Sequence, residues 1–202
     1  FNMQAGLGYM RQGAYERALD KFEKALRQQP DLVEAGLGRA AALQNLDRRI
    51  DAEAQYEDLI EAYPRRYEPA TAYAGLLCEQ QRFQQAESVL LKALKEEAFQ
   101  HGAEAYFRLS RCATRGQRPD LAKLYVLRAE ELAPNNSDIA LQRASLAYDA
   151  GNYAEAERLL EKFERHSPIR AKAVQLGYQI AYAQNNEGKL ATYGQILQQK
   201  YR

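Results

Sequence analysis

The chain has 202 residues, of which 28 are basic and 27 acidic, so its formal net charge is only +1. This balance excludes the basic excess with which proteins bind nucleic-acid phosphates. No stretch approaches the roughly 18 consecutive apolar residues of a membrane span. Ala, Leu, Gln, Glu, Arg and Lys dominate, and Trp is absent, which favours helix over strand. The composition therefore predicts an all-α fold and argues against a nucleic-acid partner.

A repeating pattern runs along the chain from its first residues. In the first copy the markers are Gly6, Tyr9, Gly13, Tyr15, Ala18, Phe22, Ala25 and Pro30. They match the tetratricopeptide repeat, a helix-turn-helix unit of about 34 residues. The marker Ala18 recurs 34 residues apart except for one step of 36 before the fourth copy, as Ala52, Ala86, Ala122 and Ala156. Two extra residues therefore lie either within 96–102 or in the turn at 116–119.

The pattern predicts an all-α, right-handed superhelical solenoid of about six helix-turn-helix units, forming one domain over residues 1–202. The units are expected at about 1–32, 33–66, 67–100, 101–134, 135–168 and 169–202. Small side chains let the two helix axes of a unit approach. Gly13 and Gly151 allow a left-handed backbone in the turns, and each closing Pro ends a second helix. The sixth unit departs most from the pattern, as suits a terminal repeat.

The reactive side chains do not indicate catalysis. His101 and His166 are the only histidines, and neither has a second His or a Cys at a metal-ligand spacing. The Gly-rich stretches 6–8 and 36–38 lie inside predicted helices, where they cannot form a phosphate-binding loop. We therefore expect no catalytic residue, no metal and no cofactor, and interpret the chain as a protein-binding module.

The two cysteines, Cys78 and Cys112, each fall late in the first helix of their unit. Stacking would bring equivalent helices side by side, so a disulfide between consecutive units is geometrically possible. Two buried free thiols that pack as small apolar side chains are an equally good interpretation. The residues alone leave both alternatives open.

One segment carries a family resemblance. Residues 71–86 read T-A-Y-A-G-L-L-C-E-Q-Q-R-F-Q-Q-A, followed by L-L-K-A-L at 90–94. This resembles the N-Y-G-x-F-L-C helix of the type IV pilus biogenesis lipoproteins, the pilotins that help the outer-membrane secretin assemble, with Ala74 where the motif has Gly. The segments 111–117 and 176–201 resemble the same family, so the likeness extends over essentially the whole chain.

The resemblance implies a non-catalytic, monomeric factor on the periplasmic face of the bacterial outer membrane that assists secretin assembly and stability. It also implies a lipid anchor on a Cys upstream of residue 1, and it favours a disulfide between Cys78 and Cys112. The chain begins inside a helical pattern without an initiator Met, so we expect a mature or trimmed form. The alternative is a general bacterial repeat scaffold that docks another protein complex.

Stacked first helices line the concave face of such a solenoid, where partners bind. The side chains there that packing does not require are Arg11, Leu37, Gln44, Asn45, Thr71, Glu79, Phe107, Arg111, Arg115, Tyr148 and Tyr182. We expect the aromatic ones to be the anchors, because such side chains concentrate binding energy at interfaces. Chaperone-type repeats resemble a carboxylate clamp that uses Lys and Asn at set positions of the first helices, where this chain has Met3, Leu7 and Ala41. An acidic C-terminal peptide is therefore a poor candidate ligand. We therefore expect an apolar or amphipathic segment of a barrel-forming subunit as the ligand.

Overall fold

The computed structural model describes residues 1–95, 101–168 and 170–200, and this part of the chain contains twelve helices. They are α1 (Asn2–Arg11), α2 (Tyr15–Gln28), α3 (Val33–Asn45), α4 (Arg49–Ala62), α5 (Tyr67–Glu79), α6 (Phe83–Ala93), α7 (Gly102–Arg115), α8 (Pro119–Leu132), α9 (Ser137–Asp149), α10 (Tyr153–His166), α11 (Ala171–Ala183) and α12 (Glu187–Lys200). None of them is long and apolar enough to cross a membrane. The contacts divide the chain into two compact parts, Phe1–His101 and Gly102–Arg202, which we call the first and the second unit; a single helix-turn-helix pair is called a repeat from here on.

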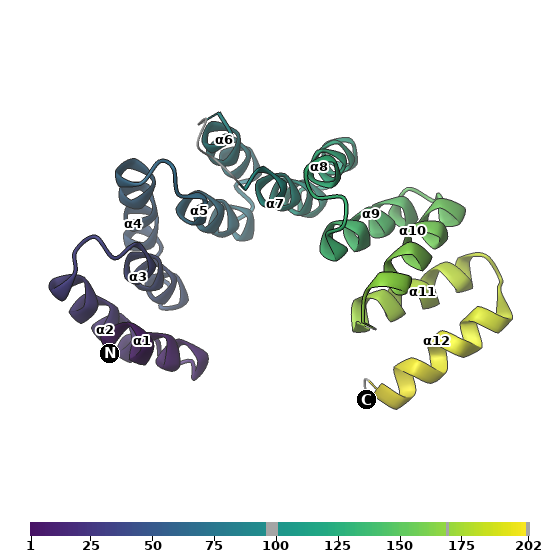
Figure 1. Ribbon diagram of the computed structural model, residues 1–202, viewed down its shortest axis with the longest axis horizontal. Coiled ribbons are helices and arrows are strands. Elements are labelled where there is room, and N and C mark those ends of the chain that lie inside the picture. The colour runs from purple at the N-terminus through teal and green to yellow at the C-terminus, as the bar shows by residue number, and fades with distance from the viewer. Residues whose placement is uncertain (96–100, 169, 201–202) are drawn as a thin grey trace. The chain divides into compact units, whose positions relative to one another are not determined.

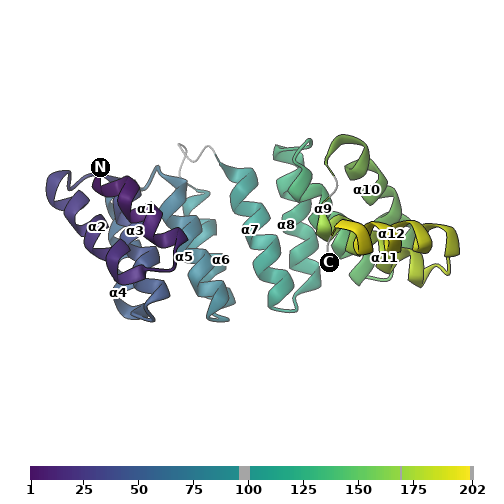
Figure 2. The same cartoon turned by 90° about the horizontal axis from the view of Figure 1, so that it is seen from below.

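In the first unit, the first helices of the three repeats lie next to one another in a row, and the second helices all lie on the same side of this row (Figure 1). The central helix α3 contacts α1, α2, α4 and α5. Figure 2 shows the same helices from a perpendicular direction, with α5 and α6 side by side. Stacking of this kind lets short helix pairs bury apolar faces that they could not bury alone.

The second unit is built in the same way from α7 to α12. Within it, α7 packs on α8, α9 on α10 and α11 on α12, and the pairs are joined where α8 meets α9 and α10 meets α11. The first helices α9 and α11 also contact each other. Over the described residues, the helix-turn-helix pairs predicted from the repeats are therefore confirmed.

Within a pair, the helices approach closely because a small residue on one faces a large residue on the other. The ring of Phe22 is fully buried and lies between Gly6 of its own repeat and Gly38 of the next. A Cβ atom would come within 2.6 Å of this ring at Gly6 and within 2.5 Å at Gly38. Both distances are far below van der Waals contact. The same principle explains why the alanine markers are 0 % exposed, namely Ala18, Ala52, Ala86, Ala122 and Ala156.

Every turn within a helix pair contains one residue with a left-handed backbone. The prediction for the two glycines is confirmed, with φ of 71° at Gly13 and 76° at Gly151. The other four turns place a non-glycine residue there, with φ between 53° and 62°, namely Asp47, Gln81, Gln117 and Asn185. A non-glycine residue is less favourable in this conformation. The four turns therefore depend on the packing of the helices that they join.

The structure also resolves where the repeat period lengthens. The turn between α7 and α8 covers residues 116–118, the same length as the turn 80–82 between α5 and α6. The two extra residues thus lie before the end of α7, and their alternative placement in the turn at 116–119 is wrong. Residues 96–100, part of the other predicted location, fall outside the described part of the chain.

An ion pair joins the starts of neighbouring first helices in both units. Arg66, just before α5, places Nη2 2.8 Å from Glu34 Oε1 in the first turn of α3. The hydrogen bond from Arg66 holds the pKa of Glu34 below its usual value. In the second unit Arg170, just before α11, pairs in the same way with Asp138 in the first turn of α9. These pairs are exposed, so each contributes less than about 1 kcal/mol.

Replacing Gly38 with Ala should lower the free energy of unfolding by about 1–3 kcal/mol, because the added methyl group overlaps the buried ring of Phe22. The matched control is Gly75→Ala in α5, where an added Cβ meets nothing within 4 Å. The better helix propensity of Ala should there raise stability by up to about 1 kcal/mol. Urea unfolding followed by circular dichroism measures both changes. Equal effects of the two substitutions would contradict the packing described for Phe22.

Candidate protein-binding surfaces

In the first unit, Arg39 of α3 points toward the second helices, where it contacts Glu23 of α2 and Gln55 of α4, and the opposite side of the first helices is mainly apolar. Six half-buried side chains share it in the 34-residue register, Met3, Leu7 and Met10 on α1 and Leu37, Ala41 and Gln44 on α3. We call these six residues the apolar face. The register continues on α5 with Gly75, next to which a Cβ atom would meet open space. Flexible thioether and aliphatic side chains without a bulky obstacle suit an apolar ligand segment.

Of the predicted binding residues of the first unit, Leu37 and Gln44 belong to this face and the others lie at its ends, with one exception. Arg11 and Asn45 are exposed at the ends of α1 and α3. Gln44 Nε2 donates a hydrogen bond of 2.8 Å to Glu79 Oε2, which links the ends of α3 and α5. Thr71, however, is only 3 % exposed, and its hydroxyl donates to the carbonyl oxygen of Glu68 in its own helix. The prediction that Thr71 faces a partner is therefore wrong.

In the second unit, Phe107 and Arg111 act together on α7. The ring of Phe107 is half-buried and packs against the cluster of Val126, Ala129 and Ile139. The guanidinium of Arg111 lies 5.8 Å from the centroid of that ring, a cation–π contact. Arg111 and Arg115 are themselves exposed. This part of α7 therefore presents two positive charges to solvent, while Phe107 mainly supports the fold.

Tyr148 in α9 and Tyr182 in α11 occupy the same repeat position but differ in exposure. Tyr148 is half-buried against the core cluster that contains Phe163, and its ring centroid lies 5.5 Å from that of Tyr153. Tyr182 is 71 % exposed. Of the three aromatic side chains expected to be anchors, Tyr182 offers the most ring surface to a partner.

A cleft that the sequence did not predict lies between the end of α2, the start of α3 and α4. It has a volume of about 230 Å³ and is lined by Leu26, Pro30, Leu32, Val33, Gly36, Gln55, Leu59 and Tyr63. Gly36 lies in its lining, and its missing side chain leaves room for Leu59, since a Cβ atom there would come within 2.8 Å of Leu59 Cδ2. The same position carries Ala140 in α9 and Val174 in α11, so the smaller residue in α3 marks this place in the sequence.

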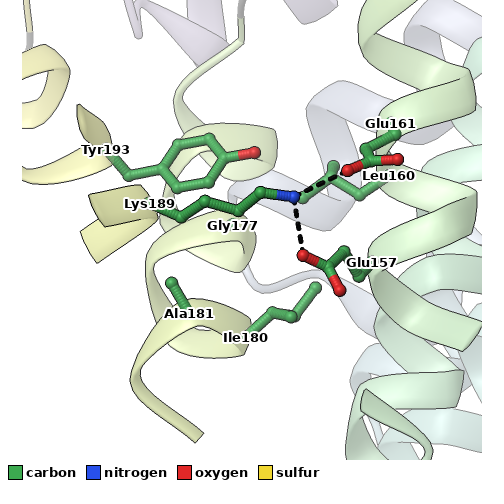
Figure 3. Close-up of a pocket in the computed structure, with 8 residues that line it drawn as sticks. All are labelled: Glu157, Leu160, Glu161, Gly177, Ile180, Ala181, Lys189 and Tyr193. Atoms are coloured by element: carbon green, nitrogen blue, oxygen red, sulfur yellow. Dashed lines mark hydrogen bonds and ion pairs between the residues drawn. The ribbon is translucent and has the colours of Figure 1, made fainter. Parts of the chain in front are cut away.

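A second feature missed at the sequence level is a cluster of charged side chains that joins α10 to α12 (Figure 3). Lys189 Nζ lies 2.6 Å from Glu157 Oε1 and 2.7 Å from Glu161 Oε1. The hydroxyl of Tyr193 donates to the carboxylate of Glu164 at 3.0 Å. The hydrogen bond from Lys189 lowers the pKa of Glu157, whereas burial raises the pKa of Glu164. The remaining cavity of about 10 Å³ holds at most one water molecule.

The two cysteines are both buried. Cys78 is the penultimate residue of α5 and is 9 % exposed, and Cys112 in α7 is 6 % exposed. They belong to different units. The disulfide between them stays a prediction.

Comparison with known proteins gives consistent results. Tetratricopeptide-repeat family models match residues 2–32 and 76–137. The chain is 26% identical over 199 residues to the type IV pilus assembly protein PilF of Pseudomonas aeruginosa, covering 98% of this chain and 79% of PilF. A solved structure of P. aeruginosa PilF matches with a TM-score of 0.77 at 26% identity, covering 99% of this chain and 90% of that one. The predicted tetratricopeptide-repeat fold is thereby confirmed.

A further solved structure supports the fold alone. PilW, described as a widely conserved type IV pilus biogenesis factor, matches with a TM-score of 0.82 at 24% identity. The match covers 99% of this chain and 92% of PilW. The two chains thus share the same fold over most of their length.

Proposed function

The chain is a tetratricopeptide-repeat protein related to those of type IV pilus biogenesis, and we propose that it is a pilotin-like scaffold that binds a secretin subunit and assists its assembly. The observation that carries the proposal is the similarity to PilF over 98% of the chain, together with the apolar face of the first unit. A scaffold of this kind has no active site. It acts by holding a partner segment, and its binding free energy comes from burying apolar surface.

The chemistry of the two first-helix surfaces supports an amphipathic partner segment. The apolar face of the first unit supplies Met and Leu side chains, which adapt to varied ligands. The second unit supplies the exposed ring of Tyr182 and the charges of Arg111 and Arg115. A segment from a barrel-forming subunit alternates apolar and polar side chains. Either surface can bind the matching side chains of such a segment.

A location in the cell envelope follows from the same relationship. The similarity to type IV pilus proteins supports association with the envelope. We further propose that the protein lies at the periplasmic face of the outer membrane and is held there by a lipid anchor. A secretin pore in that membrane would then lie within reach of the repeat surfaces.

The substitution Leu37→Glu should weaken binding to the purified secretin subunit by about ten-fold or more, because it places a charge in the apolar face. The matched control is Ile50→Glu on the second helix α4, an apolar side chain that is 86% exposed and lies outside that face. It should leave affinity unchanged. Tyr182→Ala, at an exposed position, should weaken binding without changing the free energy of unfolding by more than about 0.5 kcal/mol. Surface plasmon resonance measures the affinities.

Two outcomes would count against this proposal. Wild-type protein that does not bind the secretin subunit at all would favour the general repeat scaffold, which docks a different complex. Equal affinities for the Leu37→Glu and Ile50→Glu proteins would show that the apolar face is not the binding surface. Thermal unfolding of each variant separates a loss of binding from a loss of fold.

The proposed location also predicts the state of the cysteines. In an oxidising compartment such as the periplasm, Cys78 and Cys112 should form a disulfide. By the chain-entropy model such a bond raises the free energy of unfolding by on the order of 3–4 kcal/mol. Protein purified from its native compartment without reductant should then show no reactive thiol under denaturing conditions, and two after reduction. Two reactive thiols before reduction would argue against a disulfide and for a cytoplasmic scaffold.

A further inference from the structure

The last helix is attached differently from every other second helix. The helices α2, α4, α6, α8 and α10 each contain at least two buried residues. In α12, by contrast, no residue between 187 and 199 is buried. Local stability follows the number of buried apolar contacts. By this measure α12 is the second helix that we expect to open most readily from the rest of its unit.

The repeat register explains this weak attachment. Five first helices carry a small, buried residue at the crossing with their second helix, namely Gly6, Ala40, Ala74, Ser110 and Ala144. At the same position α11 carries Tyr178, which is 37% exposed. Its counterpart on α12 is Gly194, where the other second helices carry Phe22, Tyr56, Leu90, Val126 and Leu160. At this position the order of small and large is reversed, and the large side chain is left partly uncovered; the contact of a small with a large residue is made one position earlier on each helix, by Gly177 and Tyr193.

Polar side chains hold α12 in place instead. Lys189 pairs with Glu157 and Glu161 of α10 (Figure 3). Tyr193 donates a hydrogen bond to Glu164, so one face of α12 reaches across to three carboxylates of α10. The ring of Tyr193 lies directly on Gly177 of α11, where no Cβ atom would fit. Beside the ring, Leu160, Ile180 and Ala181 form an apolar floor. The seat of α12 is therefore an apolar groove with an acidic rim.

We propose that α12 is a displaceable helix, and that the groove of α10 and α11 beneath it receives a partner helix with a basic side chain four residues before an aromatic one. The pattern is that of Lys189 and Tyr193, which lie on one helix face because of their spacing. The three glutamates of α10 favour a basic helix over an acidic one. Gly177 admits a flat ring and excludes a branched side chain that would clash with its backbone. This site is separate from the first-helix faces and does not depend on the identity of their ligand.

A competition experiment on the full chain tests this proposal. The probe is a fluorescent peptide with the sequence of residues 184–200 of this chain, which carries the pattern itself. In the Lys189→Ala protein the resident helix competes less well. The peptide should therefore bind that protein roughly three- to ten-fold more tightly than it binds wild type. A peptide with Ala in place of its lysine should lose this gain, and the exposed-site control Gln198→Ala should behave as wild type.

Hydrogen exchange supplies the second readout. Amides of α12 should exchange faster than those of α10 and α11 in wild type, and roughly three- to ten-fold faster again in the Lys189→Ala protein. The Glu161→Gln protein should also open faster, but it should not bind the peptide more tightly, because the rim that recognises the lysine is itself altered. Unchanged exchange together with unchanged peptide affinity would overturn the proposal. The proposal would also be overturned if the Lys189→Ala protein formed a dimer that the peptide dissociates, because the helix in the groove would then come from a second copy of this chain.

Discussion

The contact between a small residue on one helix and a large residue on the next sets the spacing of the helix pairs. Phe22 shows why this constraint reaches beyond one repeat, since its ring lies between Gly6 of its own repeat and Gly38 of the following one. A side chain added at either glycine would push two helices apart and displace the neighbouring pair. The direction of the first helices, and hence the surface that they offer to a partner, depends on these crossings.

The same constraint determined how much could be predicted from the sequence. The helix pairs, the left-handed turn residues Gly13 and Gly151 and the buried Ala markers follow from short-range sterics, which recur at a fixed spacing. Side-chain exposure does not repeat in this way. Thr71 and Tyr182 were both expected to face a partner, yet one is 3 % exposed and the other 71 % exposed. Their exposure depends on which neighbours cover them.

The cleft at Gly36 and the charged cluster of α10 and α12 were missed for a related reason. Both arise where a repeat departs from the pattern, and the regular spacing of the marker residues does not reveal such departures. Lys189 and Glu157 are 32 residues apart in sequence, and only the packing of α12 brings their side chains together. Positions where the register holds but the residue size changes, such as Tyr178 and Gly194, are the signal that could have indicated these features.

Side-chain footprinting by hydroxyl radicals tests most directly the claim that the first helices form the binding surface. The full chain is labelled alone and in complex with the secretin subunit. The account predicts that Met3, Met10 and Tyr182 become protected in the complex. The exposed apolar residues Ile50 and Leu124, on the second helices α4 and α8, should be labelled equally in both states. Protection of Ile50 and Leu124 with unchanged labelling of the methionines and Tyr182 would contradict it.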